Sequence, residues 1–115
     1  MITRFPGMTP TRSRAVVHDG LIFTVAVSPD PVPAGLYEQT QRTLRRIDES
    51  LKMSGSDKSR ILSAVLYIAD LAQKQELNRA WDEWVDRANP PMRAVLGVAI
   101  EPPYLVEIVV TAAQG

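Results

Sequence analysis

Residues 36–53, LYEQTQRTLRRIDESLKM, decide the fold, because their apolar positions repeat at the spacing of an amphipathic helix. The residues that share this stripe are Leu36, Thr40, Leu44, Ile47 and Leu51. The charged residues between them face away from the stripe, and Gly55 is a natural stop at the C-terminal end. The sequence therefore predicts one long helix that must pack its apolar side against a sheet.

A strand and a second helix follow. RILSAVLYIAD, residues 60–70, is rich in β-branched and aromatic residues, which is typical of a strand covered on both sides. The second helix presents one apolar face, formed by Leu77, Ala80, Trp81, Trp84 and Val85. We interpret its two tryptophans as core residues and not as a stacking platform. Asn89-Pro90-Pro91 ends this helix.

The remaining strands lie toward the two ends of the chain. MITRF, residues 1–5, predicts a first strand, and RAVVHDGLIFTVAV, residues 14–27, predicts two strands around the hairpin signal Asp19-Gly20. Residues 88–110, ANPPMRAVLGVAIEPPYLVEIVV, predict two strands with a short Glu-Pro-Pro link, for which an antiparallel hairpin is the default. The order βββαβαββ indicates one α+β domain over residues 1–115, with about six strands and both helices on one face.

Composition excludes several classes of function. Thirteen basic and thirteen acidic side chains cancel, which argues against a nucleic-acid or membrane-surface partner. The chain has no cysteine and one histidine, His18, which we expect to be exposed beside the Asp19-Gly20 turn; this argues against a transition-metal site. No apolar run reaches the length of a signal peptide core or a membrane span, so we expect a cytoplasmic protein.

The predicted strand after Arg93 is apolar on both faces. Ala94, Leu96, Val98 and Ile100 lie on one side, and Val95, Gly97 and Ala99 lie on the other. Two helices can cover only one face of the sheet, and a solvated second face would alternate with polar residues. The pattern therefore predicts that the second face is buried against identical subunits.

Two charges interrupt the last two strands, Arg93 at the start of one and Glu107 in the middle of the other. Burying either charge alone would cost several kcal/mol, roughly. In a hairpin, Glu107 lies nearer to Gly97 than to Arg93. The distance from Arg93 to Glu107 along the sheet is then about 13 Å. If the two charges cooperate, we expect Glu107 to come from a neighbouring subunit.

Each charge has two interpretations at this stage. Arg93 presents a rigid two-pronged donor that suits a carboxylate ligand, or it forms a salt bridge or clamps loop carbonyls. Glu107 works as a general acid or base in an apolar setting, or it pairs with an arginine at a subunit contact. The sequence pattern leaves both alternatives open.

Four segments resemble the Rid (reactive intermediate deaminase) family, also called RidA/YjgF. They are AVVHDGLIFTVAV, LRRIDESLKMSGSDKSRILSAVLYIADLAQKQELNRAWDEWV, PPMRAVLGV and YLVEIVV. The resemblance covers Arg12 to Ala113 and is closest to the YoaB-like branch. It implies a chorismate-mutase-like fold, a homotrimer with a cleft at each subunit boundary, and no cofactor. It also implies hydrolysis of enamine and imine intermediates, such as 2-aminoacrylate and other 2-imino acids, to 2-keto acids and ammonia.

The resemblance also implies roles for single residues. Arg93 matches the arginine that grips the substrate carboxylate, and Ala94 matches the small residue that follows it. Glu107 matches the glutamate that orients or activates water. Asn78 matches an asparagine on the second helix near the cleft. These matches imply a catalytic pair, Arg93 and Glu107, with Asn78 and Ala94 among the substrate contacts.

Other positions depart from the family pattern. Arg12 stands where RidA-type members carry a tyrosine, and it could supply a second cation for a larger or dicarboxylate ligand. Val25-Ala26-Val27 replaces a Ser-Gly-Gln motif, although the backbone amide of Ala26 could still bind a carboxylate. These losses keep a second function open beside the deaminase, a trimeric binding module for small carboxylates or keto acids. A nuclease function, attached to some family members, is disfavoured by the zero net charge.

Overall fold

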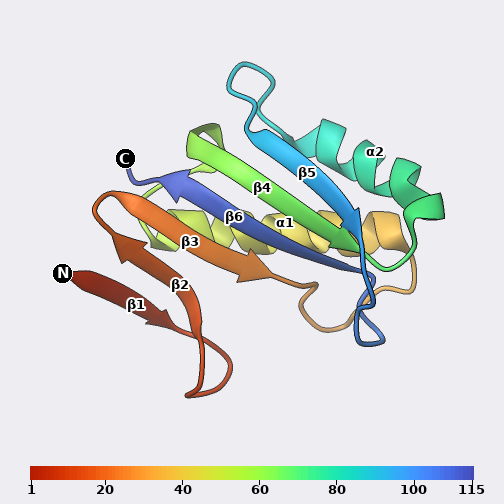
Figure 1. Ribbon diagram of the computed structural model, residues 1–115, viewed down its shortest axis with the longest axis horizontal. Helices are drawn as coiled ribbons and strands as arrows, with labels where there is room; N and C mark the ends of the chain where they lie inside the picture. Colours follow the sequence, from red (N-terminus) through yellow and green to blue (C-terminus); the bar gives the residue numbers. More distant parts are fainter.

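The computed structural model covers Met1 to Gly115 and contains six strands and two α-helices in the predicted order (Figure 1). The elements are β1 (Ile2–Pro6), β2 (Ser13–His18), β3 (Leu21–Ala26), α1 (Leu36–Met53), β4 (Ile61–Ile68), α2 (Lys74–Trp84), β5 (Met92–Gly97) and β6 (Val106–Ala113). Short 3₁₀ turns at Lys58–Arg60 and Leu71–Gln73 precede β4 and α2. Neither helix is long and apolar enough to cross a membrane.

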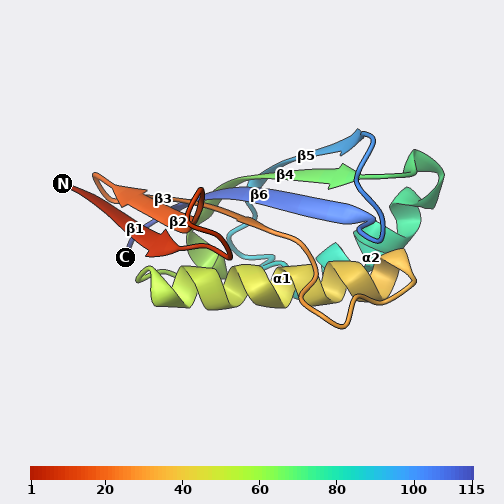
Figure 2. The same cartoon turned by 90° about the horizontal axis from the view of Figure 1, so that it is seen from below.

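The six strands form one mixed sheet in the order β1-β2-β3-β6-β4-β5. Only β4 and β5 are parallel, and the other neighbouring strands are antiparallel. Both helices lie against the same face of the sheet, as Figure 2 shows. The predicted α+β architecture with two helices on one face is therefore confirmed.

The predicted hairpin between the last two strands is wrong, because β4 lies between β5 and β6. Helix α2 returns the chain, so β5 runs parallel to β4, as a strand–helix–strand connection allows. Strand β5 also ends at Gly97 and does not reach the prolines. Residues 98–105 form a longer link that carries the chain past β4 to β6.

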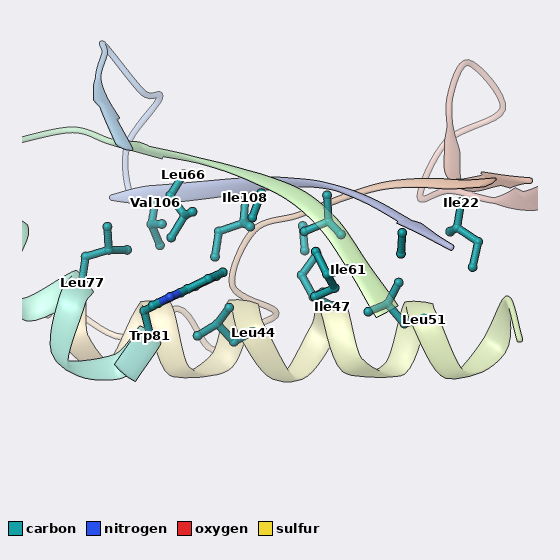
Figure 3. Packing of buried hydrophobic residues seen from close by; sticks show 14 of the residues in the cluster. Ile22, Leu44, Ile47, Leu51, Ile61, Leu66, Leu77, Trp81, Val106 and Ile108 are labelled. Atoms are coloured by element: carbon teal, nitrogen blue, oxygen red, sulfur yellow. The ribbon is translucent and has the colours of Figure 1, made fainter. Parts of the chain in front are cut away.

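The core lies between the sheet and the helices (Figure 3). All five residues of the predicted α1 stripe are buried. Trp81 is buried with them, and Trp84 packs against the same cluster while its Nε1 donates to Asp48 at 2.9 Å. The interpretation of the two tryptophans as core residues is therefore correct.

Two glycines end or turn the chain where the sequence predicted. Gly55 has φ +87°, and the N–H groups of Gly55 and Ser56 donate to the carbonyls of Lys52 and Leu51 at 3.2 and 2.8 Å, which is a Schellman motif. In the β2–β3 hairpin, Asp19 and Gly20 have φ of 49° and 76°, the positive pair that a type I′ turn requires. His18 beside this turn is exposed, as expected.

The sheet face away from the helices, here called the open face, is uncovered in the single chain. In β4, Ala64, Leu66 and Ile68 are buried beneath the helices, whereas Val65 and Tyr67 point to the open face and are only half-buried. Within one chain only the helix side of β4 is covered, so the coverage of its second side stays a prediction that requires another subunit. The open face still exposes large apolar side chains, among them Leu21, Phe23, Val25, Leu96 and Val109.

Candidate functional site

Arg93 lies on the edge strand β5 and points to the helix side of the sheet. It pairs in register with Ala64, which is buried on that side. Its guanidinium carbon lies 5.5 Å from the centre of the Trp81 ring, a cation–π distance. Arg93 takes part in none of the three ion pairs of the chain. The guanidinium is therefore held on an aromatic face without an anionic partner of its own.

Asn78 lies on α2 one turn before Trp81, the residue whose ring carries Arg93. Its Oδ1 atom is buried and has no hydrogen-bond partner in the chain. Asn78 also lines a polar hollow of about 450 Å³ along the outer side of α2. Arg93 thus offers a cation that suits a carboxylate, and the Asn78 Oδ1 atom can accept one hydrogen bond from a donor.

Glu107 lies on the other side of the sheet. Its neighbours Val106 and Ile108 are fully buried under the helices, so the carboxylate projects from the open face. It is half-buried, joins no ion pair, and stands directly opposite Tyr67 of β4. Apolar side chains surround the pair, including Leu96 beside Tyr67 and Val109 two residues along β6.

A single chain does not bring Arg93 and Glu107 together. Arg93 pairs with Ala64 and Glu107 pairs with Tyr67, so their positions differ by three residues along β4, about 10 Å. The two strands lie on either side of β4, which adds about 10 Å across the sheet. The separation is therefore about 14 Å and the side chains leave opposite faces. The sequence predicted a similar distance between Arg93 and Glu107 from a hairpin. That hairpin is absent, and the distance arises because β4 lies between β5 and β6.

The other predicted residues are spread along the sheet. Ala94 follows Arg93 and is exposed on the open face opposite Val65. Ala26 is the last residue of β3, pairs with Ile108, and is buried on the helix side. Ala26 therefore lies on the strand next to that of Glu107, with its side chain on the opposite face, and strands β6 and β4 separate it from β5.

Arg12 is exposed in the loop before β2, where its carbonyl accepts a hydrogen bond from the Gly7 N–H at 3.2 Å. Strands β3, β6 and β4 separate β2 from β5, which is about 19 Å across the sheet (Figure 1). Within one chain, Arg12 and Arg93 thus lie at opposite ends of the sheet. Arg12 cannot act as a second cation beside Arg93 of the same subunit.

The predicted residues fall into two groups. The arginine group, Arg93 and Asn78, lies on β5 and α2, and the glutamate group, Glu107 and Ala26, lies where β3 and β6 meet. Sequence reasoning missed Tyr67, because only the β4–β6 register places it opposite Glu107. It also missed that Trp81, expected in the core, carries Arg93 on its ring.

The sheet topology, the two helices and the chain's sequence define a class of protein. The profile of the endoribonuclease L-PSP family matches residues 8–114. The crystal structure of a YjgF family member from Neisseria meningitidis covers 100% of this chain and 96% of that chain, with 38% identity and a TM-score of 0.90. The chain therefore belongs to the endoribonuclease L-PSP family, which is the RidA/YjgF family indicated by its sequence.

Its relatives place it within that family. A RutC family protein from Haemophilus ducreyi is 42% identical over 114 residues, covering 98% of this chain and 97% of that protein. The RutC family protein YoaB of Escherichia coli is 37% identical over 102 residues, 88% of this chain and 89% of its own. More distantly, the human 2-iminobutanoate/2-iminopropanoate deaminase is 28% identical over 117 residues, 96% of this chain and 85% of that enzyme.

Proposed function

We propose that this protein hydrolyses small 2-imino acids to 2-keto acids and ammonia. The observation that carries the proposal is Arg93, a half-buried guanidinium on the Trp81 ring with no anionic partner in its own chain. A planar two-pronged donor in this position suits a substrate carboxylate. The deaminase activity named for the distant human relative supports the same substrate class.

The proposal includes assembly into a homotrimer through the open face. Monomeric proteins rarely expose a continuous apolar patch of this kind, and here it runs across β3, β6, β4 and β5. Arg93 and Glu107 leave opposite faces of one chain, so a site that uses both must take them from two subunits. A second copy of the chain both covers the apolar face and completes such a site.

The reaction requires little beyond positioning. Arg93 holds the carboxylate, so that the imine carbon lies at a fixed place in the cleft. The oxygen of a water molecule forms a bond to the carbon of the protonated imine, the C=N π electrons move to the nitrogen, and Glu107 accepts one proton of the water. Glu107 then returns this proton to the nitrogen of the carbinolamine. The C–N bond breaks to release ammonia, and loss of the hydroxyl proton leaves the 2-keto acid. Water is consumed and one ammonia leaves for each imine hydrolysed.

The test couples an amino-acid oxidase to the purified protein and follows the decay of the released imine for several amino acids. We expect the native protein to accelerate decay, and Arg93→Ala to abolish both turnover and binding of the carboxylate. Arg45→Ala, an exposed arginine on α1, is the matched control and should behave as native. Acceleration that persists in Arg93→Ala would contradict the assigned site.

A second function, carboxylate binding without chemistry, is favoured by the replaced polar positions at Arg12 and Val25-Ala26-Val27. Glu107→Gln separates the two functions, because it keeps the side-chain shape and removes the proton acceptor. A large but measurable fall in turnover with retained ligand binding supports the deaminase. Binding of 2-keto acids by a native protein that accelerates no imine's decay supports the binding module.

A further inference from the structure

Tyr67 and Glu107 form an isolated polar pair on the open face. They stand directly opposite each other on the antiparallel strands β4 and β6, so their Cβ atoms are about 4.5–5.5 Å apart. The remaining open-face residues of β3 and β5 are apolar, and those of β4 and β6 add only Ser63 and Thr111 farther along the strands. A phenol and a carboxylate are thus the only titratable groups on this face of the four strands.

Both groups are uncommitted within the chain. Of the three tyrosines, only Tyr37 uses its hydroxyl in side-chain hydrogen bonds, with Glu83 and Gln41 on the helix layer. The Glu107 carboxylate joins no ion pair, and both Tyr67 and Glu107 are half-buried. A hydroxyl and a carboxylate that lie side by side without bonding to each other can hold one small polar molecule between them.

We propose that Tyr67 is a second catalytic residue, which holds the attacking water together with Glu107. Both side chains leave the open face from directly opposite positions on neighbouring strands, so their oxygens can border one space over β4 and β6. A water there donates one hydrogen to Glu107 and bonds the Tyr67 hydroxyl through its second hydrogen or a lone pair. Its remaining lone pair then points away from both groups, toward a bound imine carbon. This inference rests on the proposed imine hydrolysis.

The test is a double-mutant cycle on the kinetics of imine decay. Tyr67→Phe removes only the hydroxyl, and we expect kcat to fall roughly 3- to 10-fold, the effect of one hydrogen bond, with KM within about twofold of native. In the Glu107→Gln background, Tyr67→Phe should have no further effect, because the shared water is already misplaced. In the Arg93→Lys background, Tyr67→Phe should lower kcat by the same factor as it does in the native protein.

Tyr37→Phe is the matched control, since it also removes a hydroxyl beside a glutamate but lies outside the site. It should leave kcat and KM unchanged. A merely structural role of Tyr67 would give the same factor in the Glu107→Gln and Arg93→Lys backgrounds, and that outcome would overturn the inference. So would full activity of a folded Tyr67→Phe protein. If the native protein accelerates no imine's decay, the proposed function itself fails.

Discussion

A lysine at Val109 should dissociate the assembly without unfolding the chain. Val109 lies on the open face of β6, opposite Val25, and its side chain is 38% exposed. Complete burial of a valine contributes about 1.5–3 kcal/mol, so covering the remaining two-fifths contributes about 1 kcal/mol per subunit. Placing an ammonium group in the same interface costs several kcal/mol more, roughly. The combined loss weakens association at least about 100-fold, because each 1.4 kcal/mol is a factor of about ten.

The folded monomer should tolerate the same substitution. A lysine at a partly exposed position can lay its aliphatic stem on the sheet and keep its charge in water, which costs less than about 1 kcal/mol. Sedimentation velocity at micromolar concentration measures the mass of each species, and thermal unfolding measures its stability. We expect a trimer for the native protein, a monomer for Val109→Lys, and no imine hydrolysis by the monomer.

Met53→Lys is the matched control. Met53 is also 38% exposed, but it ends α1 on the helix layer, away from the open face (Figure 2). It should sediment like the native protein. A Val109→Lys protein with native mass, or a native protein that is monomeric throughout, would refute the reasoning about the open face.

Three further predictions concern the helix end, a half-buried carboxyl and the departure at Arg12. Gly55→Ala should lower the free energy of unfolding in urea by about 1–2 kcal/mol, because φ there is +87°, whereas Gly35→Ala, at φ −97° in open space, should change it little. Burial raises the pKa of Asp48, although the Trp84 N–H and Lys58 oppose the shift, so stability should fall as the pH rises from 3.8 through the folded-state value. Asp48→Asn keeps a hydrogen-bond acceptor and should remove this decrease in the free energy of unfolding, measured by unfolding at several pH values. If the variant shows the same decrease with pH, another group causes it. Arg12→Tyr introduces the tyrosine that the family resemblance implies at this position. It should raise deaminase kcat/KM by about 3- to 10-fold, and unchanged kinetics would place residue 12 outside the cleft.

In the proposed trimer, the separation of Arg93 and Glu107 would link assembly directly to activity. Arg93 lies on the Trp81 ring within each chain, so we expect carboxylate binding to need only helix α2 and strand β5 of one subunit. The proposed water-positioning pair lies on the open face, which a second subunit must approach. Substitutions at the open face should therefore lower turnover more than they weaken carboxylate binding.

The sequence by itself determined the local elements. The α1 stripe, the Asp19-Gly20 turn and the Gly55 stop were all predicted correctly, because each depends on the spacing or backbone freedom of residues near one another in the chain. The apolar second face also followed from the alternation of side chains along single strands. The family itself was recognisable from segments that run through the chain, and its profile matches residues 8–114.

Only the tertiary structure decided which strands are neighbours. Strand β5 pairs with β4 and not with β6, because α2 returns the chain and residues 98–105 carry it past β4. Such long-range pairing depends on the packing of both helices on one face, which no local pattern reports. That pairing moves Arg93 and Glu107 to opposite faces and sets Tyr67 against Glu107. Local patterns in the sequence indicate single helices, strands and turns. The pairing of distant strands depends instead on how all the elements bury one shared core.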